Sequence, residues 1–162
     1  MSFYTIKKRR TSIIKDMLNY YGIPEVIVNS KSFIGSAMYR KKRNTKRIRN
    51  KGLPSDLKKL YMENKKSIKR ETIYAEYVFD SNTINLNQNE LDNDKEFLIS
   101  VLHEIKHAID SKDMGHAHFK NSYFNEMDMH ESFNNDGYTH NKYEIEAEEF
   151  ALREYNQWLA KL

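Results

Sequence analysis

The chain has 162 residues, of which 39% are hydrophobic and 31% charged, and this composition suits a single domain with one core. It contains no cysteine, which excludes disulfide bonds and cysteine-based zinc sites and leaves His, Asp and Glu as metal ligands. The sequence has no secretory signal and no run of about 18 apolar residues. We therefore expect a cytoplasmic protein with no membrane partner.

The net charge of +4 conceals an uneven distribution. Residues 1–70 carry a net charge of +16, and residues 71–162 carry −12. Most of the positive charge lies in residues 40–70, where 14 Lys and Arg face 2 acidic residues. We interpret this segment as a basic insert in a single domain spanning residues 1–162. It is either a solvated face or a surface for nucleic acid or another acidic partner.

The first half of the chain predicts one helix and several short strands. Apolar residues at helical spacing predict a helix over residues 4–21, which Gly22 and Pro24 end. The apolar run 26–28 predicts a strand, and residues 32–39 predict a second one. Residues 72–87 are rich in β-branched and aromatic side chains on either side of an Asp-Ser-Asn turn, which predicts a hairpin or two successive strands.

The second half predicts two helices separated by a loop. Asn93 and Glu96 form a capping box that begins a long helix over residues 94–110. Residues 111–142 are polar and predict a long loop or a loosely folded lobe, and a final helix follows over residues 142–161. The whole pattern predicts an α+β domain with a small mixed sheet.

The long helix contains the sequence His-Glu-Ile-Lys-His, from His103 to His107. Two histidines four residues apart lie on one helical face and can bind one zinc ion, with Glu104 beside them as the general base. A chain of this composition would contain roughly 0.02 such motifs by chance. The motif therefore predicts a zinc-dependent peptidase in which Glu104 activates a zinc-bound water.

A catalytic zinc ion needs a third protein ligand, and the final helix offers carboxylates. A helical wheel places Glu144 and Glu148 within the apolar stripe of that helix. A buried carboxylate is costly unless it meets a cation. We therefore expect Glu144 to be the third ligand and Glu148 to orient a histidine, although both could also lie in water at the edge of the stripe.

The motif at 103–110, Tyr138 and the Glu144-x-x-Ala147-Glu148 pattern resemble the gluzincin type of zincin metallopeptidase. They are most similar to the catalytic domain of anthrax lethal factor and the Pro-Pro endopeptidases, and small ImmA/IrrE-like metallopeptidases share a related arrangement. The resemblance covers residues 97–155. It implies a zincin-like fold, Glu144 as a zinc ligand, and Tyr138 as a group that stabilises the oxyanion, with the tyrosine one residue away from the family's spacing.

Two other interpretations of the sequence stay open. The segment from Gly115 to Phe119 resembles the part of SprT-like proteases that donates a third histidine, which would make His116 the ligand in a nucleic-acid-associated enzyme. The chain could also be a catalytically silent zincin-fold interaction protein, and its composition suits a phage or mobile-element protein, including one associated with a virion. In the peptidase interpretation, a protein or peptide substrate pairs with the last strand of the 72–87 region.

Overall fold

The structure is a computed structural model that describes residues 3–30, 75–87 and 93–162, and these residues fall within one compact unit. The described residues form four helices: Phe3–Tyr20 (α1), Asp94–Met114 (α4), His116–Ser132 (α5) and Lys142–Leu159 (α6). They also form three strands, Ile27–Ser30 (β1), Ala75–Val78 (β2) and Thr83–Leu86 (β3), and a short 3-10 turn, Phe79–Ser81 (η1). The predicted α+β class is confirmed. The predicted strand 32–39 and the basic segment 40–70 lie outside the described residues.

The three strands form one mixed sheet in the order β1-β3-β2. β3 pairs in parallel with β1 and antiparallel with β2, with Ile84 opposite Val28 on one side and Tyr77 on the other. The hairpin predicted within 72–87 is therefore present, and Asn82 adopts a left-handed backbone conformation at its turn. The last strand, which we expected to offer its edge to a substrate, lies instead in the middle of the sheet. Only β1 and β2 are edge strands among the described residues.

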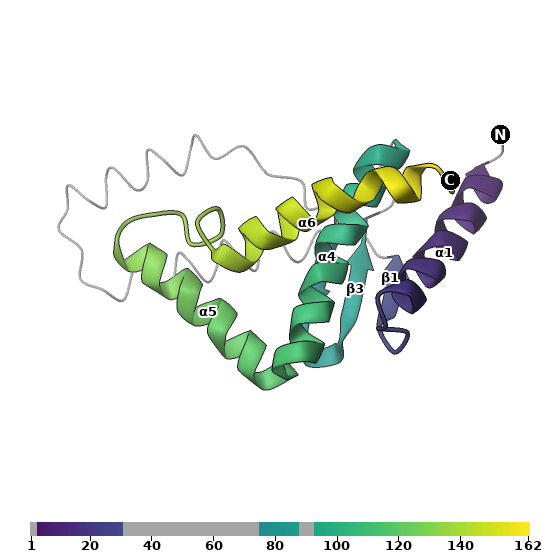
Figure 1. The fold of residues 1–162 in the computed structure, drawn as a ribbon. Coiled ribbons are helices and arrows are strands. Elements are labelled where there is room, and N and C mark those ends of the chain that lie inside the picture. The colour runs from purple at the N-terminus through teal and green to yellow at the C-terminus, as the bar shows by residue number, and fades with distance from the viewer. Residues whose placement is uncertain (1–2, 31–74, 88–92) are drawn as a thin grey trace. The chain divides into compact units, whose positions relative to one another are not determined.

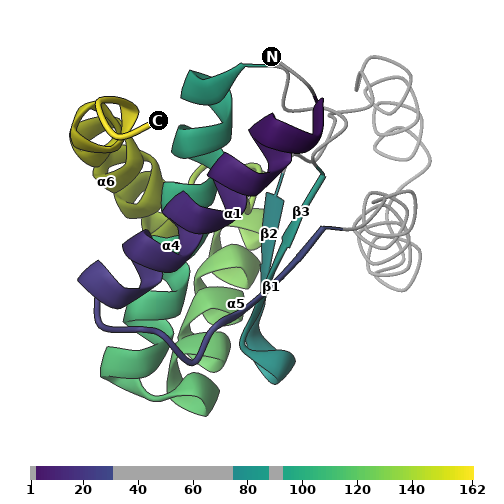
Figure 2. The same ribbon diagram turned by 90° about the vertical axis from the view of Figure 1, so that its right-hand side faces the viewer.

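Helix α4 occupies the centre of the unit (Figures 1 and 2). One side of it packs on β2 and β3, and another side packs on α6. Five of its apolar residues are fully buried in the core, which explains why a helix with so many charged residues holds this position; they are Phe97, Leu98, Val101, Leu102 and Ile105. Asn93 caps its first turn by accepting a hydrogen bond from the Glu96 backbone N–H, as the sequence predicted.

Helix α1 passes obliquely in front of α4 in the view of Figure 2. Its stripe of Ile13, Ile14, Met17 and Leu18 enters the same core as α4 and α6. Arg10 bonds Asp94 at the start of α4 at 3.0 Å and stacks over the Phe97 ring. No helix of the described residues is long and apolar enough to cross a membrane.

The prediction of a loop over residues 111–142 is wrong for most of that segment. Helix α4 continues to Met114, and α5 follows after Gly115, whose positive φ of 85° lets the chain turn sharply. Phe119 and Tyr123 recur at helical spacing and pack with Tyr143 of α6 in a second, smaller cluster. Most other residues of α5 are polar and either partly buried or exposed, so the apolar face is too narrow to dominate the sequence pattern.

Candidate metal centre

Helix α4 presents both histidines of the motif on one face. His103 and His107 are one turn apart, and their rings lie 4.9 Å apart, centre to centre. The His107 residue is 4% exposed, and the side chain of His103 is 13% exposed. The helix buries both rings because the residues on either side of them belong to the core.

Helix α6 brings a carboxylate to the same place. Glu144 lies in the first turn of α6 and is 7% exposed. The Asn141 side chain caps this helix by accepting a hydrogen bond from the Tyr143 backbone N–H at 3.0 Å. The cap fixes where α6 begins, and therefore where Glu144 points. The positive end of the helix dipole also favours an ionised carboxylate in this turn.

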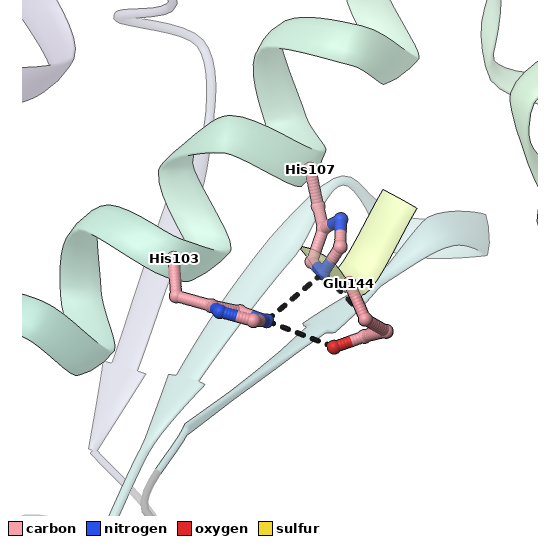
Figure 3. Close-up of side chains that lie close together, drawn as sticks. All are labelled: His103, His107 and Glu144. Atoms are coloured by element: carbon pink, nitrogen blue, oxygen red, sulfur yellow. Dashed lines mark hydrogen bonds and ion pairs between the residues drawn. The ribbon is translucent and has the colours of Figure 1, made fainter. Parts of the chain in front are cut away.

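The ligand atoms of the three side chains converge on one point (Figure 3). His103 Nε2 lies 3.2 Å from His107 Nε2 and 3.0 Å from Glu144 Oε2, and His107 Nε2 lies 3.3 Å from Glu144 Oε1. Zinc bonds of about 2.0–2.1 Å at tetrahedral angles place neighbouring ligand atoms about 3.3–3.4 Å apart. The three distances are similar to this spacing, although the two histidines approach different oxygens of Glu144, so the group is compact enough to surround one metal ion.

The electrostatics of the metal-free group agree with a cation site. Burial disfavours the charge on His103, but hydrogen bonds to Glu144 and Glu148, together with the charge of Glu104, raise its pKa from 6.5 to about 10. Burial alone would raise the pKa of Glu144, but the two histidines outweigh it and lower that pKa well below its usual range. The pocket therefore holds an anionic ligand that requires a positive partner.

Aromatic rings hold His107 in place. Its ring meets Tyr123 edge-on at 5.8 Å and lies 6.2 Å from the Phe119 ring. Its Nδ1 atom is buried and has no hydrogen-bond partner among the described residues. At the Nδ1 side this ring is therefore supported by packing, whereas His103 Nδ1 lies 3.5 Å from Glu148 Oε2.

Sequence reasoning missed Tyr123. Its hydroxyl group donates a hydrogen bond to Glu144 Oε1, and the residue is only 6% exposed. The signal was present as the helical spacing of Phe119, Tyr123 and Met127, which the many polar neighbours obscured. A tyrosine in a segment interpreted as a loop gave no reason to connect it with Glu144.

Two other predicted site residues, Glu104 and Glu148, lie on the same two helices. Glu104 is buried on α4 at 7% exposure, and its charge acts on His103. Glu148 does approach His103, but its side chain is 55% exposed, so it lies at the edge of the apolar stripe of α6.

The remaining two predicted site residues, His116 and Tyr138, lie at the start of α5 and after its end. Tyr138 is half-buried in the turn between α5 and α6, where its backbone N–H donates to Asp136. Its contact with an oxyanion stays a prediction. His116 begins α5, and its Nδ1 lies 2.5 Å from Ser111 Oγ. Among the described residues, the group that could hold a metal ion contains Glu144 and not His116.

Comparisons with protein-family models, with curated proteins and with solved structures give no match to this chain.

Proposed function

We propose that this chain is a zinc-dependent metallopeptidase of the gluzincin type that hydrolyses peptide bonds in a protein substrate. One observation carries the proposal: His103, His107 and Glu144 direct their ligand atoms to one point, although Glu144 is 41 residues from His103. Two imidazoles and one carboxylate are a donor set of catalytic zinc sites, which keep a fourth position for water. The motif residue Glu104 lies beside this group.

Each residue has a role in the proposed reaction. His103, His107 and Glu144 would hold the metal. The chemistry that a bound zinc ion supplies is a lowered pKa of a coordinated water and a polarised substrate carbonyl. Glu104, buried on the same helix, would accept the proton of that water as general base. Tyr138 would donate a hydrogen bond to the oxyanion.

The substrate would lie as an extended chain beside the sheet. Since β3 is central, the candidate edge is β2, which packs against α4. Its neighbour Phe79 contacts Tyr123 at 5.2 Å between ring centres, so this hairpin borders the aromatic cluster next to His107. Binding of nucleic acid through residues 40–70 stays a separate prediction, because that segment lies outside the described residues.

The test of the catalytic role is Glu104→Gln. We expect purified wild-type protein to contain one zinc per chain by elemental analysis and to cleave members of a broad peptide library. Glu104→Gln should keep the zinc and lose about 10²–10⁴-fold in cleavage rate, because it removes only the proton acceptor. Cleavage at the wild-type rate would contradict the mechanism. Zinc without any cleavage by the wild type would favour a silent zincin.

The choice of third ligand is tested in parallel by Glu144→Gln and His116→Ala. We expect Glu144→Gln to lose stoichiometric zinc, because a neutral amide is a poor zinc ligand. His116→Ala should retain it, as should the matched control Glu149→Gln on the exposed face of α6. Loss of zinc from His116→Ala with retention by Glu144→Gln would instead identify the SprT-like arrangement.

A further inference from the structure

Tyr123 joins the middle of α5 to the beginning of α6 at two points. Its hydroxyl group donates to Glu144 Oε1. Its backbone carbonyl accepts a hydrogen bond of 3.1 Å from Asn141 Nδ2, and Asn141 in turn caps α6. Glu144 is thereby held through its carboxylate and through the first turn of its own helix.

We propose that Tyr123 is the positioning residue of the metal centre, fixing the carboxylate of Glu144 in the orientation that a metal ion requires. This inference rests on the proposed function, because it concerns the same site. It adds to the zinc site a residue that neither the motif nor the glutamate pattern identifies.

The hydrogen bond distinguishes the two carboxylate oxygens. Oε1 accepts from Tyr123 and lies 3.3 Å from His107 Nε2, whereas Oε2 lies 3.0 Å from His103 Nε2. The hydrogen bond from Tyr123 thus fixes Oε1, and with it the plane of the carboxylate, while Oε2 faces His103. Outer partners of this kind orient ligating carboxylates and contribute to metal affinity.

The surroundings of Tyr123 make it a rigid support. Its ring lies 5.2 Å from Phe79, 5.5 Å from Phe124 and 6.3 Å from Tyr143, centre to centre. It also contacts the His107 ring edge-on. A ring enclosed on several sides has few rotamers available, so its hydroxyl group is held toward Glu144 at little further entropic cost. Because its hydroxyl group contacts Glu144, Tyr123 acts through the ligand, and its role is therefore positioning.

The test compares Tyr123→Phe with the wild type and with Tyr143→Phe. Both variants remove a hydroxyl group from the same buried cluster, but only Tyr123 bonds Glu144. We expect Tyr123→Phe to weaken zinc binding about 10–100-fold, measured by competition with a chromophoric chelator. Tyr143→Phe should stay within about threefold of the wild type, since it removes no contact to a ligand. Circular dichroism of the metal-free forms checks that each variant is folded.

A double-mutant cycle separates positioning from general packing. In the Glu144→Ala background, Tyr123→Phe should change the residual zinc affinity by less than about threefold, because the carboxylate through which its hydroxyl group acts is absent. If Tyr123→Phe did not fold, the proposed hydrogen bond could still be tested by NMR spectroscopy of the wild-type chain. A hydroxyl group bonded to Glu144 keeps its proton in slow exchange in NMR spectra, and a rapidly exchanging proton would overturn the proposal.

The outcomes distinguish this inference from the function on which it rests. If the wild type binds zinc and folded Tyr123→Phe binds it equally tightly, the positioning role is wrong and the metallopeptidase proposal stands. If the wild type binds no zinc, both fail together. A tenfold or greater loss confined to Tyr123→Phe supports both.

Discussion

Glu144 is the residue on which the contacts of the candidate site converge. It is almost fully buried. Its carboxylate contacts His103 and His107 of α4 and accepts a hydrogen bond from Tyr123 of α5. A buried carboxylate is costly without such partners, so its position reflects the packing of α4, α5 and α6 together. The histidines, in contrast, are placed by one helix alone.

The pH dependence of zinc binding follows from His103. In the metal-free chain its pKa of about 10 lies above the ordinary value of 6.5, so its protonated form stabilises the fold fully below pH 6.5. That contribution is lost as the pH rises toward 10, and the ring becomes available to zinc over the same range. Glu144 has a lowered pKa and stays ionised throughout.

We therefore expect the increase in melting temperature caused by zinc to grow between pH 6.5 and pH 8.5. Calorimetry of the protein with zinc and with a chelator, at matched pH values, measures this difference. A zinc effect that is constant or that declines over this range would contradict the assignment of His103 as a ligand.

At the scale of elements, the turn between α5 and α6 determines where α6 begins and so where Glu144, in its first turn, lies. This turn approaches α5 closely at Gly137. A Cβ atom added there would lie 2.7 Å from the Met127 carbonyl oxygen and 2.7 Å from its Cγ atom. Backbone cannot move aside as a flexible side chain can, so only glycine fits without a shift of the turn.

We expect Gly137→Ala to lower the free energy of unfolding by about 1–3 kcal/mol, the usual cost of overpacking. It should also weaken zinc binding, because the displaced turn leads directly to the α6 cap. Urea unfolding of the metal-free chain and zinc titration measure the two effects. The exposed neighbour Asn135 provides the control Asn135→Ala, and equal stability of the two variants would show that the close approach is not required.

The packing between elements explains why the sequence predicted α4 well and α5 poorly. The α4 pattern is strong, because a capping residue, an apolar stripe and the histidine motif agree. Helix α5 shows only a narrow stripe, and it is completed by Phe79 of the hairpin, whose ring lies 5.4 Å from Phe119. Because the apolar partners of α5 come from a distant turn, the sequence of residues 116–132 alone does not indicate a packed helix.

In the molecule as a whole, Tyr21, the residue directly after α1, connects α1 to the C-terminal half of α6, far from the candidate site. The Tyr21 hydroxyl group donates to Glu154 Oε2 at 2.9 Å and accepts from Trp158 Nε1 at 3.0 Å. Trp158 is 1% exposed, so its indole N–H would have little access to water if this partner were lost. The contact fixes the C-terminal half of α6, while Glu144 lies in its first turn.

We expect Tyr21→Phe to lower the free energy of unfolding by about 1–3 kcal/mol through the unsatisfied indole group. Zinc affinity should stay within about twofold, because the contact is remote from the ligands. Tyr20→Phe, at a residue that is 63% exposed, is the matched control and should leave both quantities near the wild-type values. A large loss of zinc affinity in Tyr21→Phe would show that the two ends of α6 are coupled.

The sequence by itself determined what depends on local spacing. Two histidines at i and i+4 share a face of any helix, and the apolar stripes of α1, α4 and α6 follow from the same periodicity. It also determined that Glu144 belongs to a mostly apolar stripe, which the structure bears out at 7% exposure. The tertiary structure alone decided that Tyr123 meets Glu144, that β3 lies between β1 and β2, and that Glu148 stays half in water. These depend on how separate elements pack, and packing joins residues whose spacing along the chain follows no fixed period.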